Sequence, residues 1–392
     1  MEKLKVGYIF DSYPYQRNVI DKVDGVEYVK VFNVNQYLSL LFKVLNKVNL
    51  VNDRYKYYYG FSFNDYGYNK IDLLHTFNSV SFSNKPWLST FETFIPRYSS
   101  MPYEQDNKAI KELETLAKDS CKKIIAISEC TKKIQLELLD RFPKYRDRIK
   151  DKICVIHPPQ KLFVRNFEEK NLKTEELSFI FVGREFFRKG GMEILTAFTN
   201  LKEQYRLKVK LTMISSFIGH DYATKATKAD LNKAKEIINN NRDWITYYPS
   251  LPNDQVIALM KKHHVGLLPT WADTYGYSVL EMQASGCPVI TTDVRALPEI
   301  NDNNKGWVIK VPKDKLGEAF YSTQEERNQL SAIIEKGLER NILNICQNTN
   351  QLKIKSEAAI RGIKMNHSPE KYAQQLGDIY QESILRKTHC SD

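Results

Sequence analysis

Charged side chains follow an apolar run in the middle of the chain, in a pattern suited to binding a diphosphate. The run 177–182 ends at Gly183, and Arg184 and Lys189 lie between it and a glycine pair that opens a helical segment. Arginine can hold two phosphate oxygens at once, and lysine adds a mobile positive charge. A basic loop ahead of a helix N-terminus is a place where a diphosphate is neutralised. Taken alone, the segment fits two surface cations beside a helix start equally well.

A second segment combines two acids with a glycine at the start of a helix. Asp273 follows an apolar run, Gly276 lets the backbone turn, and a helical pattern begins near Tyr277 or Ser278. The free amides and the dipole of such a helix suit a phosphate. Glu281, in the first or second turn, could accept two hydrogen bonds from a ribose diol. For Glu281 alone, compensation of the helix dipole is an explanation that needs no ligand.

Together, the two segments resemble the family-4 glycosyltransferases, the large retaining group with the GT-B fold. That family carries an acid, seven residues and a glutamate, followed by a helix of small residues and Gly-x-Pro-Val. Asp273 through Val289 match this pattern, and the loop from Gly183 to Lys189 matches the diphosphate loop of the family. The resemblance covers most of the C-terminal half of the chain and extends weakly into the N-terminal half.

The resemblance implies a role for each of these residues. Asp273 would hold the hydroxyls of the donor sugar, and Glu281 would hold the ribose of the nucleoside. Arg184 and Lys189 would hold the diphosphate and stabilise it as it leaves. Arg184, Lys189 and Asp273 are therefore the candidate catalytic residues. The candidate donor-binding residues are Gly183, Gly276, Tyr277, Ser278 and Glu281.

Short apolar runs alternate with segments of helical period along both halves of the chain, which is typical of parallel α/β units. The strands expected in the first half are 4–10, 28–34, 71–77, 87–91, 123–128 and 153–157, with helices at 107–119 and 129–140. Those expected in the second half are 177–183, 209–214, 244–248, 265–269, 288–292 and 307–311, with helices at 191–204, 223–240, 253–263 and 277–285. From Asp314 onward the pattern predicts helix only.

The alternation breaks at a proline pair that begins with Pro158, and the charged residues up to Glu176 are typical of a linker. We predict an N-terminal Rossmann-like acceptor-side domain over 1–160, a C-terminal Rossmann-like donor domain over 161–368, and a helix over 369–392 that packs back on the N-terminal domain. The predicted fold class is α/β of the GT-B type. Its two Rossmann-like domains would face a central cleft, with the C-terminal helical segment bracing both. Ligands in such sheets bind at the carboxyl ends of the strands.

The residues that would face an acceptor depart from the family pattern. Many relatives carry a histidine after the strand 87–91, where this chain has Glu92, and the usual glycine pair of the first loop is replaced by residues 11–17. Glu92 could contact the donor sugar, position the acceptor hydroxyl, or pair with Arg97 at the strand end. Ser128 is placed to accept a free amide at the start of the following helix. Glu92 and Ser128 are the candidate acceptor-side residues.

No metal and no cofactor are expected, because the donor sugar nucleotide is itself a substrate. The six cysteines show neither a CxxC pair nor a zinc-like spacing, and no Asp-x-Asp pair is present to clamp a divalent ion. Arginine, lysine and helix amides would take the diphosphate charge instead. His75, at the end of an apolar run, is expected to be a hydrogen-bonded structural residue.

The net charge of +11 favours polyanionic partners. No DNA- or RNA-binding motif is present, so nucleic acid is not expected, and an anionic membrane surface or a phosphorylated small molecule remains. The cations between residues 122 and 152 could be solvated helix faces or could meet such a surface. The stretch 37–50, in which leucines and valines alternate with Lys43 and Lys47, could rest in a membrane interface or pack on its own sheet.

The sequence therefore predicts a cytoplasmic enzyme, peripheral on the inner face of the plasma membrane, because it shows neither a spanning segment nor a signal peptide. The expected activity is retaining, metal-independent transfer of a hexosyl unit from a nucleotide diphosphate sugar. The acceptor would be a saccharide or lipid-linked saccharide, as in bacterial surface polysaccharide or lipopolysaccharide biosynthesis. A phosphorylase or epimerase on the same fold, or a binding protein without turnover, are the alternatives.

Overall fold

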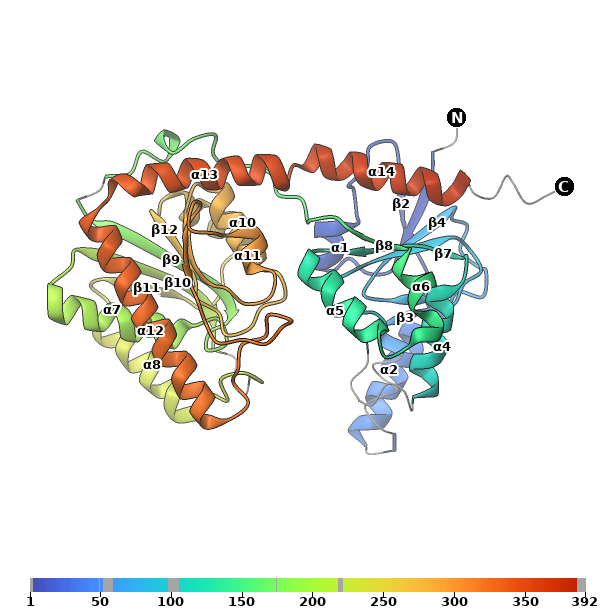
Figure 1. Ribbon diagram of the computed structural model, residues 1–392, viewed down its shortest axis with the longest axis horizontal. Helices are drawn as coiled ribbons and strands as arrows, with labels where there is room; N and C mark the ends of the chain where they lie inside the picture. Colours follow the sequence, from blue (N-terminus) through green and yellow to red (C-terminus); the bar gives the residue numbers. More distant parts are fainter. Residues whose placement is uncertain are drawn as a thin grey trace. The chain divides into compact units, whose positions relative to one another are not determined.

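Two parallel sheets organise the chain, one in each of two units (Figure 1). The computed structural model describes residues 3–48, 50–51, 59–97, 106–173, 175–217 and 221–385. Unit 1 comprises Met1–Pro159 and Pro369–Asp392, and unit 2 comprises Gln160–Ser368. Every strand expected from the sequence is present; the strand 87–91 has the predicted bounds, and the others have one or both ends shifted.

Unit 1 is built on a six-stranded parallel sheet with the order β2-β1-β4-β6-β7-β8. Its sheet strands are β1 (Lys5–Tyr8), β2 (Glu27–Lys30), β4 (Leu73–Phe77), β6 (Trp87–Phe91), β7 (Cys121–Ala126) and β8 (Ile153–Val155). A separate pair consists of β3 (Ser62–Phe63) and β5 (Val80–Ser81). The helices are α1 (Tyr13–Asn18), α2 (Val34–Lys47), α4 (Asn107–Ala117), α5 (Glu129–Leu139), α6 (Pro143–Lys150) and α14 (Pro369–Leu385).

Neighbouring residues of the unit 1 strands alternate between two apolar cores, one on each face of the sheet. Leu74 and Ile124 belong to one core, together with residues of α4, α5 and α6. Leu73 and Ile125 belong to the other, together with residues of α14. Side chains that alternate with a period of two make the strands apolar on both faces, which is what a covered parallel sheet requires.

Helix α14 completes the second core of unit 1. Tyr372, Leu376 and Tyr380 are buried there. The Tyr380 hydroxyl lies 2.8 Å from Nδ1 of His75, and Nε2 of His75 lies 2.8 Å from Oγ1 of Thr90. Burial lowers the pKa of His75 to about 3, so the ring is neutral near physiological pH. His75 is thus a hydrogen-bonded structural residue, as expected.

Unit 2 has the sheet order β11-β10-β9-β12-β13-β14, again with parallel neighbours. The strands are β9 (Leu177–Glu185), β10 (Val209–Ser216), β11 (Ile245–Tyr248), β12 (Val265–Leu268), β13 (Val289–Thr292) and β14 (Trp307–Ile309). The helices are the 3-10 turn η2 (Glu168–Lys170), α7 (Gly191–Tyr205), α8 (Lys228–Asn240), α9 (Asn253–Lys261), α10 (Tyr277–Ala284), α11 (Leu297–Ile300), α12 (Gln324–Gln347) and α13 (Asn350–Asn366). The order of the strands reverses between β9 and β12. Ligands of doubly wound sheets bind outside the carboxyl ends of the strands at such a reversal.

The segment 161–176 is not a free linker, which corrects the expectation from its composition. Lys170 is only 8% exposed, and its ammonium donates to the carbonyl oxygens of Ser285 at 2.7 Å and Met260 at 3.2 Å. These carbonyls lie at the C-terminal ends of α10 and α9, where the helix dipole favours a cation. One buried charge therefore fastens this segment to unit 2.

Two helix starts predicted from the sequence are wrong, because side-chain caps place them later. The helix predicted from Ala223 begins at Lys228, where Thr227 and Asp230 form a capping box. The helix predicted from Asp314 begins only at Gln324, where Thr323 is the cap. Residues 314–323 instead include a turn, in which the Asp314 amide donates to the Glu318 carbonyl at 2.8 Å.

Candidate active site

The loops that follow β9 and β12 lie side by side at the strand reversal of unit 2. They contain the two segments singled out in the sequence. The backbone amide of Trp271 donates to the Arg188 carbonyl at 2.9 Å, and the Thr270 hydroxyl donates to the same oxygen at 3.0 Å. Residues far apart in the sequence are thereby held at one edge of the sheet.

A glycine precedes each of the two helices that begin at this edge. Gly190, with a φ of +85°, caps α7, and a Cβ atom there would lie 2.2 Å from the Pro269 carbonyl oxygen. Gly276, with a φ of +94°, caps α10. Residues other than glycine rarely adopt this left-handed backbone conformation. The two glycines therefore allow α7 and α10 to start where the loops meet.

An ion pair between Lys189 and Asp273 joins the two loops. The Lys189 ammonium donates to Oδ2 of Asp273 at 2.6 Å, and the side chains are 11% and 14% exposed. Gly183 makes room for the lysine stem, because a Cβ atom at that position would lie 2.9 Å from Cβ and Cγ of Lys189. The structure thus brings three of the predicted site residues together.

Burial and mutual attraction set the charge state of this pair. Burial disfavours ionisation of Asp273, but the Lys189 ammonium, with help from Arg188, holds the pKa of the carboxyl below its usual value. Burial lowers the pKa of the Lys189 ammonium, with Asp273 opposing the shift. The pair therefore consists of a desolvated lysine held by a carboxylate. A phosphate that binds here would favour the charged ammonium form of Lys189.

Arg184 is exposed at the end of β9, and the structure does not bring it into the Lys189–Asp273 pair. Its backbone carbonyl accepts a hydrogen bond from the Ser216 hydroxyl. Within the described part of the chain, no hydrogen bond or ion pair of its guanidinium is found. The side chain is therefore available to a ligand, as the predicted diphosphate role requires.

Arg188 was not singled out in the sequence, yet its side chain contacts more residues around the Lys189–Asp273 pair than the side chain of Arg184 does. Its guanidinium pairs with Glu185 at 2.5 Å, donates to the Ala272 carbonyl at 2.8 Å and lies over the Tyr222 ring. Although burial opposes the charge, the hydrogen bond with Glu185 and the neighbouring negative groups raise the pKa of Arg188. Arg188 therefore holds the loop that carries Asp273. Its position next to Lys189 was the only available signal, and the partners come from tertiary structure.

The remaining donor-side candidates lie in the first two turns of α10. Tyr277 and Ser278 are the first two residues of this helix and are half-buried. Their amides belong to the helix N-terminus, where the first amides have no partner within the helix. Glu281 lies in the second turn and is 7% exposed. These positions agree with the predicted helix start.

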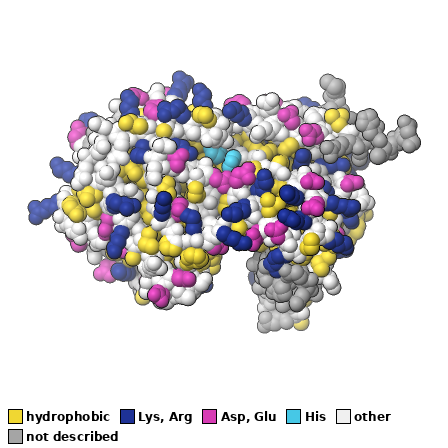
Figure 2. Space-filling view, in the orientation of Figure 1, with side chains coloured by type: hydrophobic (Ala, Val, Ile, Leu, Met, Phe, Trp, Pro, Cys, Tyr) yellow, Lys and Arg dark blue, Asp and Glu magenta, His cyan; other side chains and the backbone are white. Residues whose placement is uncertain are grey.

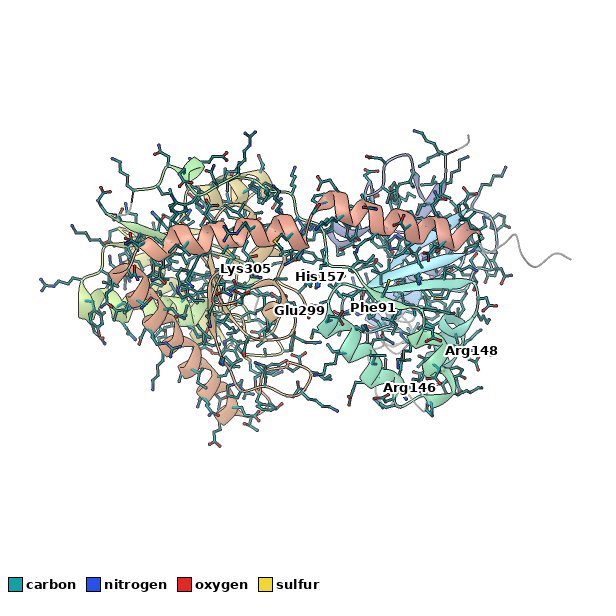
Figure 3. The ribbon with its side chains drawn as sticks, turned by 45° about the horizontal axis from the view of Figure 1, so that its top comes forward. Phe91, Arg146, Arg148, His157, Glu299 and Lys305 are labelled. Carbon is teal, nitrogen blue, oxygen red and sulfur yellow. The ribbon has the colours of Figure 1, made fainter. Side chains whose placement is uncertain are left out.

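The carboxyl edge of the unit 1 sheet carries the acceptor-side candidates. Glu92 directly follows Phe91, the last residue of β6 (Figure 3). Its carboxylate accepts from Arg97 Nη1 and from Asn78 Nδ2, both at 3.2 Å. Of the alternatives left open above, the structure therefore shows the pairing with Arg97. Ser128 caps α5, as predicted, by accepting the Thr131 amide at 2.9 Å.

In the basic stretch from 122 to 152, helices α5 and α6 carry exposed cations and cations that are paired with acids. Arg146 and Arg148 are exposed on α6 (Figure 3), and Arg146 pairs with Asp140 at 2.9 Å. Lys132 pairs with Glu129. Figure 2 shows the same mixture more widely, with cationic and acidic side chains interspersed over the visible face.

The residues that the structure describes contain no group of three or more His, Cys, Asp or Glu side chains arranged to hold a metal ion. None of their helices combines the length and apolar character needed to cross a bilayer. The five cysteines among them form no disulfide with one another, and Cys390 lies outside the described residues.

The fold is that of the GT-B glycosyltransferases. A solved glycosyltransferase structure from Rickettsia africae superimposes with a TM-score of 0.61, covering 98% of this chain and 99% of that chain at 15% sequence identity. Within this fold, residues 164–340 match the family model described as glycosyl transferases group 1. The matched segment includes both loops of the candidate site.

Two curated relatives agree with this family match. The chain is 25% identical over 219 residues to the uncharacterized glycosyltransferase MJ1607 of Methanocaldococcus jannaschii, which covers 54% of this chain and 53% of that protein. It is 26% identical over 136 residues to the capsular polysaccharide biosynthesis glycosyltransferase CapH of Staphylococcus aureus, which covers 34% and 35%. The matches thus span about half, or less, of the length of these relatives.

Proposed function

We propose that the chain is a retaining family-4 glycosyltransferase that transfers a hexosyl unit from a nucleotide diphosphate sugar to a saccharide or lipid-linked saccharide. The observation that carries this proposal is the Lys189–Asp273 ion pair at the strand reversal of unit 2. It places a desolvated cation and a carboxylate beside the N-terminus of α10. The same edge is where doubly wound sheets bind ligands.

The proposed chemistry divides the site between diphosphate and sugar. Arg184, Lys189 and the first amides of α10 would hold the diphosphate and stabilise the charge that develops as it leaves. Asp273 would accept hydrogen bonds from the sugar hydroxyls, and Glu281 from the ribose. Arg188 would act indirectly, by positioning the loop of Asp273.

The proposed transfer exchanges one bond at the anomeric carbon for another on the same face of the sugar. The bond to the diphosphate oxygen breaks while the acceptor oxygen bonds to that carbon, so the anomeric configuration is retained. The departing phosphate oxygen takes the proton of the acceptor hydroxyl. The nucleoside diphosphate and the glycosylated acceptor are the two products.

Surface polysaccharide or lipopolysaccharide assembly is the proposed setting, with the chain peripheral on the cytoplasmic face of a bacterial membrane. The capsular role in the name of the staphylococcal relative supports this setting. Unit 1, with Glu92 at its sheet edge, would provide the acceptor side.

A screen with sugar nucleotides tests the proposed activity. UDP, GDP, ADP and their hexoses are first compared by thermal shift, because a ligand that binds the native state raises the melting temperature. The best donor is then assayed with saccharide acceptors, and the anomeric configuration of the product is determined by NMR. Transfer with retention supports the proposal. Phosphorolysis or epimerisation would assign the chain to another activity of the fold, and binding without turnover would make it a binding protein.

A chelator tests the proposed independence from metals. The donor site offers lysine, arginine and helix amides to the diphosphate, so we expect EDTA to leave the transfer rate nearly unchanged. Rates of purified enzyme are compared before and after EDTA, and again after magnesium or manganese is added back. A strict requirement for either ion would show that the diphosphate is held in a different way.

A further inference from the structure

Helix α2 of unit 1 exposes a row of large apolar side chains to solvent. Five large apolar side chains of α2 and its C-cap are each 51–62% exposed. They recur at the spacing of one helix face and form what we call the α2 stripe, namely Tyr37, Leu40, Leu41, Val44 and Val48. An ordinary surface helix turns such a stripe toward the core. Of the two alternatives left open for this stretch, packing on its own sheet therefore does not account for the α2 stripe.

The opposite side of α2 attaches the helix to unit 1 through polar and aromatic contacts. Asn35 is buried, and its amide donates to the Ser62 hydroxyl at 2.9 Å. Phe42 stacks on Tyr59, with ring centroids 5.2 Å apart. Figure 1 shows α2 extending away from the sheet of unit 1. The helix is thus anchored by its other side while the stripe remains uncovered.

Exposed aromatic side chains lie around the start of α2. The Phe32 ring lies 5.4 Å from the Tyr37 ring and is 47% exposed. The Asn69 side chain bonds both the amide and the carbonyl of Phe32, which ties the loop containing Tyr66 and Tyr68 to this region. These two tyrosines are 73% and 78% exposed. Tyrosine combines an apolar ring with a polar tip and is enriched where protein meets the membrane interface.

The charge of this surface is complementary to anionic lipid. No acidic residue occurs from Val31 to Val51. Lys43 and Lys47 are exposed one turn apart, and both follow Leu40 at helical spacing, so they border the α2 stripe. Lysine beside an apolar helix face can reach anionic headgroups while the apolar side chains enter the acyl boundary.

We propose that the α2 stripe, together with Phe32, Tyr66 and Tyr68, docks unit 1 on an anionic lipid bilayer. The helix has 14 residues, so it lies in the interface and does not span it. The lysines provide the preference for anionic headgroups, and the stripe provides the apolar contact. This surface would bring a lipid-linked acceptor to the chain if the proposed function holds, but the docking itself does not depend on catalysis.

Vesicle flotation of the full chain tests this surface. Vesicles of mixed phosphatidylcholine and phosphatidylglycerol are compared with phosphatidylcholine alone, and we expect clear binding only to the mixed vesicles. The variant Leu40→Ser/Leu41→Ser/Val44→Ser should weaken this binding by roughly tenfold or more. Lys43→Glu/Lys47→Glu should weaken it by a similar factor, because each lysine near an anionic surface contributes about 1 kcal/mol, a fivefold change.

Matched variants on unit 2 control for general changes in polarity and charge. Ile354 and Met365 are 68% and 63% exposed on α13, and Ile354→Ser/Met365→Ser should bind vesicles like the wild type. Lys228→Glu/Lys233→Glu on α8 gives the same charge change as the lysine variant. Circular dichroism and nucleotide calorimetry verify that every variant is folded and that its donor site is intact.

Three outcomes would overturn the proposal. The wild type could fail to bind mixed vesicles, or the stripe variant could bind them as well as the wild type does. Analytical ultracentrifugation could also show a dimer that the stripe variant converts to a monomer, which would assign the stripe to a second copy of the chain. If vesicle binding fails but sugar transfer is observed, the proposed function still holds. If vesicles bind but no sugar transfer is observed, the docking surface still holds.

Discussion

The carboxyl edges of the two sheets each carry an acid that is paired with a cation, but the pairs are built differently. In unit 2, Lys189 and Asp273 are 84 residues apart in sequence and 2.6 Å apart in space, with side chains 11% and 14% exposed. In unit 1, Arg97 and Glu92 are five residues apart and 3.2 Å apart, with side chains 26% and 23% exposed. The first pair connects two loops across the strand reversal. The second closes a single loop.

The difference in burial and in sequence separation between the two ion pairs makes the edge of the unit 2 sheet the better candidate for binding a charged ligand. A desolvated ion pair is costly to form and is held only where further contacts fix its geometry. The loops of unit 2 supply these contacts, because Arg188 bonds to Ala272, Thr270 and Trp271. The pair of unit 1 is local and reachable by water, and Asn78 is an additional partner of Glu92. A buried and braced charge is the better candidate for catalysis.

The largest effect is expected when the cation of the unit 2 pair is removed. Lys189→Ala removes the ammonium that would face the leaving diphosphate. We expect kcat/KM for transfer to fall by about 100- to 1000-fold, which corresponds to about 3–4 kcal/mol of transition-state stabilisation. Release of nucleoside diphosphate, measured as initial rates, checks this value.

Two further variants separate catalysis from folding in this test. Lys189→Ala also leaves Asp273 buried without its cation, whereas Arg184→Ala changes an exposed side chain and should cost a comparable loss of rate. Lys210, which pairs with Glu176 at 3.1 Å near the start of β10, is the matched control. Lys210→Ala should stay within about twofold of wild type, because exposed ion pairs contribute little. Near-normal rates for both Lys189→Ala and Arg184→Ala would show that the donor does not bind at the carboxyl edge of the unit 2 sheet.

The next effect concerns the stability of unit 2 and its dependence on pH. Burial raises the pKa of Glu193, in the first turn of α7, to about 7, and the hydrogen bond from Ser331 offsets part of this shift. The folded carboxyl therefore binds its proton more tightly than the unfolded one. The stability that it contributes is present below its ordinary pKa of 4.5 and is lost as the pH rises through about 7.

Glu193→Gln should remove this pH dependence. We expect the free energy of unfolding near pH 8 to rise by about 2–3 kcal/mol, since the variant no longer buries a carboxylate. Urea unfolding over a range of pH values measures the slope. Ser331→Ala sharpens the test, because loss of the offsetting hydrogen bond should extend the decline to higher pH. An unchanged slope in Glu193→Gln would show that Glu193 is not its source.

A smaller effect separates the two acids of the proposed donor site. If Glu281 holds the ribose, Glu281→Gln should weaken binding of the bare nucleoside diphosphate and of the sugar nucleotide. If Asp273 touches only the sugar, Asp273→Asn should reduce turnover and leave affinity for the bare nucleotide nearly unchanged. A missing hydrogen bond in a buried polar site costs about 1–3 kcal/mol. Calorimetry of both variants with both ligands checks the division, and equal losses of bare-nucleotide affinity would contradict it.

The smallest effect is expected at the edge of unit 1. Because Glu92 is engaged by Arg97 and Asn78 and is partly solvated, Glu92→Gln should change the free energy of unfolding by less than about 1 kcal/mol. We expect donor affinity to be unchanged and kcat/KM to stay within about threefold of wild type. Rates at several acceptor concentrations measure this. A loss that approaches that of Lys189→Ala would show that the two edges are equally engaged in the reaction.

Local chemistry explains why much of the architecture could be predicted. Apolar runs with the period of a strand, separated by helical segments, allow only a few arrangements of parallel α/β units. Ser128 was found as a cap because its hydroxyl acts on an amide three residues away. The errors at Ala223 and Asp314 have the same local origin. At both places a threonine, Thr227 or Thr323, caps the helix by accepting the amide three residues later.

The sequence by itself determined the order of the elements, the glycines that open α7 and α10, and the residue types of the candidate donor site. Each of these depends on neighbours within a few positions. Only the tertiary structure decided that Lys189 pairs with Asp273 and that Arg188 braces the loop between them, because both contacts depend on β9 and β12 becoming neighbours in the sheet. It also decided which side of α2 is left exposed. An apolar stripe looks the same in sequence whether a sheet covers it or solvent does, and its surroundings are fixed only when the rest of unit 1 has packed.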